Sequence, residues 1–379
     1  GTHGLTWLDL GALAPTTTCS IAPGGGANLA LHTNHNNCPS VATAATTPLH
    51  GGISDNDPAV AFAAGSVSLS GVLPQDGPAV VFGVSVTTAL YRALQLAQYG
   101  GSCANSDATN CVPTLTRSQL SSLFAQSLMD WSGFKGSDGT PLTDLGTPTD
   151  EFVRICRRVA TSGTQASFEA YFLGERCGGP GPIWTFALPD DSSTILDTVY
   201  SPNDFVSGSL VNAAPSSANV RSCLASASAN GFWALSMLSM EVNDSQYMAG
   251  TAGFRFVAID GAAPNLKNVA NGDYDFYTES KINRVASITG VPAAVIDLLA
   301  EKLNDPLVLA NINLSYDGRP WGNGGVLVIA RAGTPPTNTA PYSDAEMTAS
   351  PINTQSKFGR TCWPSIMRFD QPPDGTPNP

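Results

Sequence analysis

Short apolar segments that suit buried strands alternate with amphipathic, helix-like segments along most of this chain. Residues 79–86 form an apolar run that leads into a helical pattern over 87–98, and residues 151–156 lead through a turn into 166–173. Apolar runs of this length favour strands, whereas apolar spacings of three and four favour helices. The alternation therefore predicts an α/β fold with a mostly parallel sheet.

The remaining elements continue this pattern. Thr116 and Gln119 form a capping box at a helix start, and Pro292 suits the first turn of another helix. Since the chain has 379 residues, it exceeds the usual size of one hydrophobic core, and two lobes are expected. Strands are expected at 5–10, 28–32, 183–188, 232–237, 254–259 and 273–279, and helices at 116–131, 220–228 and 292–303.

Composition excludes two broad classes of protein. Apolar residues make up 42% of the chain, but no run of about 18 of them exists, so a membrane-spanning helix is not expected. The net charge of −12 leaves no basic stripe to neutralise phosphates, which argues against a nucleic-acid partner.

Eight cysteines indicate disulfides. Their number is even and none forms a Cys-x-x-Cys pair, which favours an oxidising compartment and an exported protein. Cys103 with Cys111, and Cys19 with Cys38, each flank a short polar loop, so we predict these two bridges. The pairing of the other four stays open. Cys362 lies in a Pro- and Thr-rich C-terminal tail, residues 333–379, and predicts that this tail is stapled to the body.

The segment from Arg158 to Gln165 is the strongest candidate for a binding site. It places a guanidinium before a helix start made by Ser162, Gly163 and Thr164. The first N–H groups of a helix have no partner within the helix and attract anions. A purely structural alternative stays open, because Ser162-x-x-Gln165 is also a capping box.

The spacing Arg-x-x-x-Ser-Gly-Thr resembles the ligand loop of the phosphate-type periplasmic solute-binding proteins. Three other segments resemble that family in the same order: Gly52-Ile-Ser54-Asp55, Leu115-Thr-Arg to Trp131, and Ile259-Asp-Gly to Tyr274. The resemblance spans residues 50–282. The chain also resembles a relative of these phosphate-type proteins, the periplasmic sterol-binding protein of bacterial sterol transport, which carries a lipid instead of an oxyanion.

The resemblance implies a type II, two-lobe α/β fold with mixed sheets flanked by helices and a ligand cleft between the lobes. Lobe I would comprise residues 1–82 and 272–379, lobe II residues 83–271, with two crossing strands between them. The implied ligand-binding residues are Ser54, Asp55, Arg158, Ser162, Gly163 and Thr164.

Two departures from the family affect the expected ligand. Phosphate binders of the family have an Asp where this chain has Ala160, so an acceptor for a protonated oxyanion is missing. The N-terminal phosphate-contacting loop has no counterpart in residues 1–30. The sequence therefore favours a lipid such as a sterol over an oxyanion, and the aromatic residues near the crossings permit it: Phe82, Tyr91, Phe232, Trp233, Tyr274 and Tyr277.

The function expected from these observations is capture of a solute and its delivery to a membrane transport component, by a monomeric periplasmic or otherwise exported protein. Phosphate or another oxyanion is the alternative ligand, and an extracellular adhesive or structural role is the alternative class. No cofactor and no covalent chemistry are expected.

Enzymatic and metal-binding alternatives have weak support. The chain has no Gly-x-Ser-x-Gly pentapeptide and no Gly-Lys-Ser/Thr phosphate loop, so serine hydrolysis and nucleotide hydrolysis by those routes are not expected. His32-x-x-His35-x-x-Cys38 has ligand-like spacing, but Cys38 is better explained by a disulfide. Asp55-Asn-Asp57 lacks the further ligands of a calcium loop.

Overall fold

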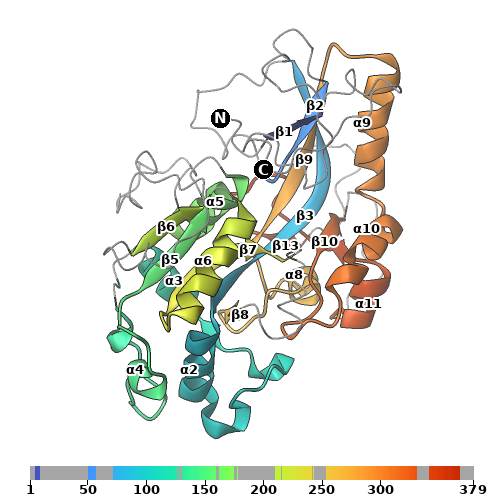
Figure 1. The fold of residues 1–379 in the computed structure, drawn as a ribbon. Coiled ribbons are helices and arrows are strands. Elements are labelled where there is room, and N and C mark those ends of the chain that lie inside the picture. Colours follow the sequence, from blue (N-terminus) through green and yellow to red (C-terminus); the bar gives the residue numbers. More distant parts are fainter. Residues whose placement is uncertain are drawn as a thin grey trace.

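One long strand, β3 (Val72–Thr87), runs through the whole fold (Figure 1). The computed structural model describes residues 50–56, 71–125, 128, 130–158, 162–174, 177, 210–214, 216–240, 242, 253–330 and 341–367, and the backbone of 5–8. Eleven of the strands in this part join into one sheet, and two short strands form a second.

The partners of β3 change along its length. Its first half pairs antiparallel with β9 (Tyr277–Val285) and β10 (Val326–Ile329), ending at Val81 opposite Tyr277. Its second half, from Phe82 on, pairs antiparallel with β7 (Ala234–Ser239) and β8 (Phe254–Ile259). A single strand thus joins two groups of elements, and the predicted α/β class is confirmed.

The outer strands complete a mixed sheet. β2 (Gly51–Ser54) pairs antiparallel with β9, and β1 (Leu5–Leu8) pairs antiparallel with β2. β5 (Arg154–Arg158) runs parallel to both β7 and β6 (Val211–Ala214). β4 (Thr114–Leu115) and β11 (Ile352–Asn353) are parallel to β8 and β10, whereas β12 (Gln355–Ser356) and β13 (Ile366–Met367) form the antiparallel second sheet. The expectation of a mostly parallel sheet was wrong, because β3 and β9 run antiparallel to most of their neighbours.

Helices flank these sheets. Figure 1 shows α6 beside β5 and β7, and α9 along the opposite side of the fold, near β9 and β3. The α-helices described are α2 (Thr88–Tyr99), α3 (Arg117–Phe124), α4 (Leu142–Leu145), α5 (Gly163–Phe168), α6 (Ser217–Ala229), α8 (Leu266–Asn271), α9 (Gly290–Lys302), α10 (Pro306–Asn313) and α11 (Asp344–Ala349).

Most sequence boundaries hold within a few residues, with three exceptions. The strand expected at 79–86 is longer, since β3 already begins at Val72. The capping box of Thr116 and Gln119 is confirmed, but α3 ends at Phe124 and does not reach Trp131. Asp130 is extended, and its carboxylate caps a separate 3₁₀ turn, Trp131–Gly133, so Trp131 does not belong to α3. The crossing strand expected at 273–279 begins only at Tyr277. The strands expected at 28–32 and 183–188 lie outside the described residues.

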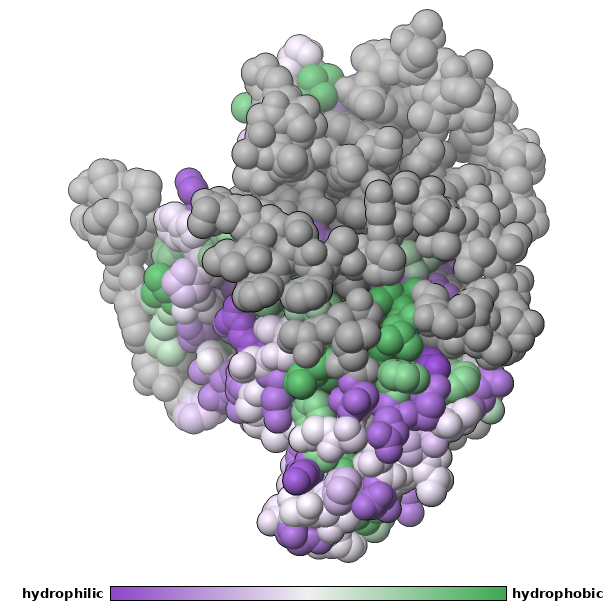
Figure 2. Space-filling view, turned by 90° about the vertical axis from the view of Figure 1, so that its left-hand side faces the viewer, coloured by the Kyte–Doolittle hydropathy of each residue, from purple (hydrophilic) through white to green (hydrophobic). Residues whose placement is uncertain are grey.

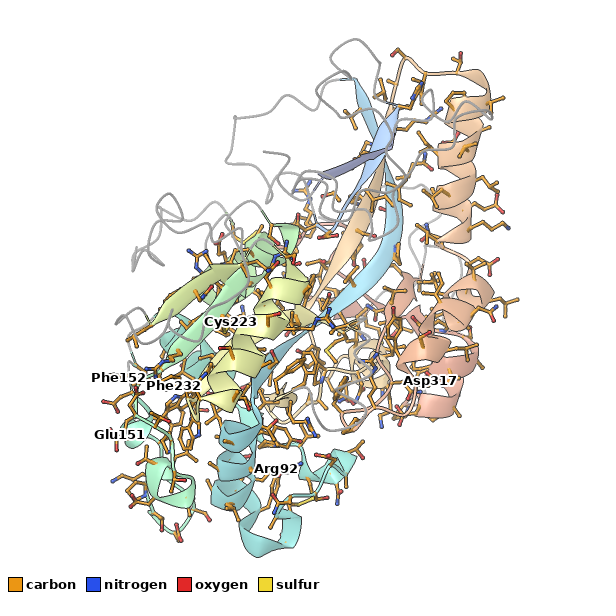
Figure 3. All side chains as sticks on the ribbon, in the orientation of Figure 1. Arg92, Glu151, Phe152, Cys223, Phe232 and Asp317 are labelled. Atoms are coloured by element: carbon orange, nitrogen blue, oxygen red, sulfur yellow. A yellow bond between two sulfur atoms is a disulfide. The ribbon has the colours of Figure 1, made fainter. Side chains whose placement is uncertain are left out.

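The six aromatic residues near the crossings belong to the core. All of them are at most 8% exposed and lie in one hydrophobic cluster, and the Tyr274 hydroxyl donates to the Phe82 carbonyl at 2.6 Å. Phe232, labelled in Figure 3, carries the Arg154 guanidinium over its ring at 3.9 Å. Packing therefore accounts for these side chains without a ligand.

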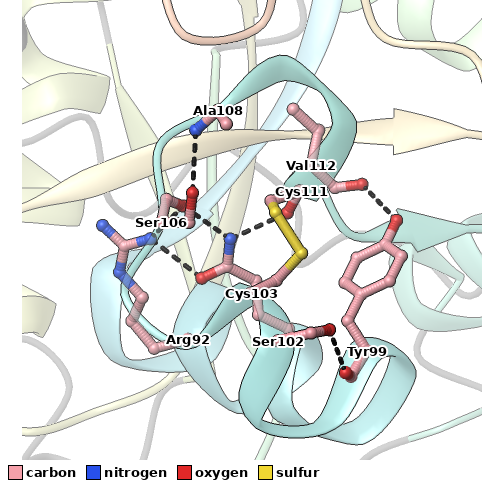
Figure 4. Close-up of a disulfide and its surroundings, with 9 residues drawn as sticks. Arg92, Tyr99, Ser102, Cys103, Ser106, Ala108, Cys111 and Val112 are labelled. Carbon is pink, nitrogen blue, oxygen red and sulfur yellow. Dashed lines mark hydrogen bonds between the residues drawn. A yellow bond between two sulfur atoms is a disulfide. The ribbon is translucent and has the colours of Figure 1, made fainter.

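Three disulfides join described cysteines. The predicted Cys103–Cys111 bridge is confirmed, and Figure 4 shows it closing the loop that Arg92 and Ser106 also stabilise. Cys156 on β5 pairs with Cys223 on α6, and Cys177 pairs with Cys362, which confirms that the C-terminal tail is stapled to the body. The predicted Cys19–Cys38 bridge lies outside the described residues.

The described surface gives no sign of a membrane-spanning element. None of the helices in the described ranges combines the length and apolar character needed to cross a bilayer. In Figure 2, hydrophilic residues cover most of the lower part of the face shown, and apolar residues gather above them.

Candidate functional site

The N-terminus of α5 is built from Ser162, Gly163 and Thr164, which follow β5 in the chain. Ser162 is extended, and its hydroxyl accepts a hydrogen bond from the Gln165 N–H at 3.4 Å. Gln165 does not complete the capping box, because its Oε1, which would have to accept the Ser162 N–H, has no hydrogen-bond partner among the described residues; its Nε2 donates to Glu169 at 3.1 Å. All residues of α5 are buried, so this helix start lies inside the protein and not on an open surface.

The end of β2 meets this helix start. The Asn56 side chain donates to the Gly163 carbonyl at 3.0 Å and to the Ser167 hydroxyl at 3.1 Å. The neighbouring Asp55 is close enough to Gly163 that an added Cβ there would lie 2.8 Å from Asp55 Oδ2. Two segments separated by 107 positions in the chain thus come together.

Backbone contacts hold Asp55 in place. The Thr278 hydroxyl on β9 donates to the Asp55 carbonyl at 2.6 Å, and the Ser54 hydroxyl donates to the Asn56 carbonyl at 2.6 Å. Ser54 is fully buried, and its hydroxyl stabilises this turn.

The charges of Asp55 and Arg158 influence each other. Burial raises the pKa of the Asp55 carboxyl above its ordinary value, and the Arg158 guanidinium opposes that rise. Arg158 also donates from Nη1 to the Ser217 hydroxyl, at 3.1 Å, in the first turn of α6. The site therefore combines a guanidinium, a helix N-terminus and a carboxyl group that burial drives toward its neutral form. This combination suits a small anion, to which a neutral Asp55 carboxyl would donate a hydrogen bond.

Some of the predicted site residues meet at the start of α5, and others do not. Asp55 lies against Gly163 and interacts with Arg158, while Ser162 and Thr164 are each 7% exposed beside them. Ser54 is next to Asp55 in the chain, but its hydroxyl donates to the Asn56 carbonyl. Ala160, where the family has an acceptor, lies outside the described residues.

Sequence reasoning missed Asn56, Ser167 and Ser217. Ser167 lies one helical turn after Gly163, and its hydroxyl donates to the Gly163 carbonyl at 2.9 Å, so helical spacing could have indicated it. Asn56 and Ser217 reach the site only through tertiary contacts, for which the sequence carries no local signal.

Gly163→Ala is expected to destabilise the protein by about 1–3 kcal/mol, because the new methyl group would overlap Asp55. Urea unfolding followed by circular dichroism measures this loss. Gly133→Ala is the matched control, since a Cβ at Gly133 meets no atom within 4 Å. Equal stability of the two variants would contradict the close approach of Asp55 to α5.

A metal centre has no support in the described ranges. Within them, no group of three or more His, Cys, Asp or Glu side chains could hold a metal ion. His32, His35 and Cys38 lie outside those ranges, so the weak metal-site alternative stays untested.

Comparison with known proteins gives distant structural similarity only. No protein-family model matches the chain, and no curated protein matches it. A putative phosphate ABC transporter substrate-binding protein with bound phosphate from Clostridium perfringens is 15% identical, with a TM-score of 0.40, covering 69% of this chain and 77% of its own. An ABC-type phosphate transport receptor from Vibrio cholerae is 13% identical, with a TM-score of 0.36, covering 66% of this chain and 72% of its own. Similarity at this level does not assign the chain to a family.

Proposed function

We propose that this chain is a solute-binding protein that holds a small oxyanion between the Ser54–Asp55 segment and the N-terminus of α5. The observation that carries the proposal is the contact of Asp55 and Asn56 with the first turn of α5, at Gly163. Backbone N–H groups at a helix N-terminus and the Arg158 guanidinium supply positive potential. Ser162 and Thr164 supply hydroxyl groups beside them.

An oxyanion is preferred here to the lipid that the sequence favoured. The aromatic residues that permitted a lipid cavity pack against one another in the core, so they give no separate support to a lipid. Ala160 and the unmatched N-terminal loop still argue for a selectivity that differs from that of the family's phosphate binders. The Asp55 carboxyl, when protonated, would donate a hydrogen bond to the anion and remove the charge repulsion.

The proposed lobes are residues 1–82 with 272–379, and residues 83–271. The change of β3 partners at Val81 and Phe82 supports the first boundary. The site would then lie between the lobes, because Asp55 belongs to one and Arg158 to the other. Capture would involve closure of the lobes about β3 and β9.

The proposed setting is the periplasm or another exported location, where a monomer would deliver its ligand to a membrane transport component. Three disulfides between described cysteines support an oxidising compartment. No covalent chemistry is proposed for the site.

Arg158→Gln is expected to weaken phosphate binding by about 10- to 100-fold, the value of one charge-assisted hydrogen bond. Isothermal titration calorimetry with inorganic phosphate, and separately with sulfate, measures the loss. Lys302→Gln is the control: it also removes one positive charge, but from an exposed position on α9.

A parallel titration with cholesterol in detergent micelles separates the two ligand classes. Saturable sterol binding with no response to either anion would overturn the oxyanion proposal and restore the lipid. Equal anion affinity of the Arg158 and Lys302 variants would place the anion elsewhere.

A further inference from the structure

The Cys177–Cys362 disulfide joins distant parts of the fold. Cys177 follows the π-helix η5 (Glu169–Leu173), which extends α5, whereas Cys362 lies in the C-terminal segment, 185 positions later. The other two disulfides of the described residues each stay within 83–271. Cys177–Cys362 is therefore the one among these three that links the two proposed lobes.

The residues before Cys362 wrap around the start of β9. We call residues 354–362 the strap. Both carboxylate oxygens of Glu279 accept backbone N–H groups of the strap, from Lys357 and from Gly359, at 2.5 Å each. The Lys357 ammonium donates to the carbonyls of Asp275 and Tyr277 at 2.7 and 3.0 Å. The strap is thus hydrogen-bonded to residues 275–279, the segment through which the chain crosses between the proposed lobes.

The π-helix η5 also contacts that segment. The Tyr171 ring stacks on Phe276 with ring centroids 4.5 Å apart, and its hydroxyl donates to the Asp275 carboxylate. Arg117 lies over the Tyr171 ring at 4.0 Å and donates to the Tyr171 carbonyl. Residues 275–279 therefore contact both the strap and η5, and Cys177–Cys362 joins the strap to the chain after η5.

The three disulfides differ in exposure. Cys156 and Cys223 are fully buried, and Cys103 and Cys111 are 7% and 5% exposed. Cys177 and Cys362 are only partly buried. Thiol–disulfide exchange requires access to a sulfur atom. A reducing agent in solvent is therefore expected to reduce Cys177–Cys362 before the other two described disulfides.

We propose that Cys177–Cys362 is a redox-sensitive latch that restrains movement of the two lobes about the 275–279 crossing. The inference rests on the proposed function, which requires the lobes to open and close. A dithiol would release the latch in two displacements. Its first thiolate attacks one cysteine sulfur, the other cysteine leaves as a thiolate, and a mixed disulfide forms; its second thiolate then attacks the mixed disulfide, which expels the remaining cysteine as a thiolate and closes the oxidised dithiol. The bridge gains two electrons and the dithiol loses two.

Amide hydrogen exchange of the ligand-free protein tests the latch. In a Cys177→Ser/Cys362→Ser variant, residues 163–173 and 274–281 are expected to exchange at least about tenfold faster than in the wild type, since local openings become easier. The core strands β7 and β8 should change less. Cys103→Ser/Cys111→Ser is the matched control, because it removes a bridge within one lobe. Unchanged exchange in both segments, or an equal rise throughout the core, would overturn the proposal.

If the double-serine variant does not fold, brief treatment of the native protein with dithiothreitol tests the latch instead. Mass spectrometry of alkylated peptides should show Cys177 and Cys362 modified before the Cys103–Cys111 and Cys156–Cys223 pairs, with faster exchange in the same segments. Earlier reduction of either other bridge would contradict the latch. These readouts need no ligand. Failure of phosphate binding would therefore refute the proposed function, whereas hydrogen exchange and the order of reduction would decide separately whether the latch exists.

Discussion

Trp233→Ala is expected to lower the free energy of unfolding by about 3–5 kcal/mol, the range for removing a large aromatic side chain from a packed core. Trp233 is 0% exposed and meets Trp131 edge-to-face with ring centroids 6.1 Å apart. Its packing is tight on another side as well, because a Cβ on Gly146 would lie 2.9 Å from the Trp233 ring. The surrounding backbone cannot close such a cavity fully.

Guanidinium unfolding monitored by circular dichroism measures this change. Trp363→Ala is the control, since Trp363 is 41% exposed, and its loss is expected to cost less than about 1 kcal/mol. Similar losses for the two tryptophans would contradict the placement of Trp233 in the core.

The buried ammonium of Lys357 is expected to make stability rise with pH above about 8. Burial lowers the pKa of Lys357 from 10.5 to about 8, although the Asp275 and Glu279 carboxylates oppose this shift. The side chain is 3% exposed, so little solvent screens the effect. Between the two pKa values the unfolded chain holds a proton that the folded chain has released, and raising the pH therefore favours the folded state. Below pH 8 both states are protonated and Lys357 adds no pH dependence.

Comparison with Lys357→Met isolates this contribution, because other groups titrate alike in both proteins. Burial raises the pKa of Tyr277, for example, so its titration opposes folding at high pH in each of them. Between pH 8 and 10.5 the wild type is expected to gain up to about 3 kcal/mol relative to the variant. Urea unfolding at several pH values measures the difference. A constant difference across this range would show that the Lys357 ammonium is not buried in the folded protein.

Local sequence signals were sufficient for much of the fold. The capping residues Thr116 and Ser162 lie where α3 and α5 begin, and the apolar run at 254–259 is strand β8. The loop between Cys103 and Cys111 is short enough to make their pairing the simplest one. These features depend on neighbouring residues only, which is why periodicity and spacing revealed them.

The sequence therefore determined by itself the α/β class, one disulfide and the residues that open α5. Only the tertiary structure decided that Asn56 reaches Gly163, that Cys177 pairs with Cys362, and which strands pair with β3 and β9. Each of these features joins residues far apart in the chain. Their pairing depends on how whole elements pack to bury apolar surface and satisfy buried polar groups, and no local pattern encodes that choice.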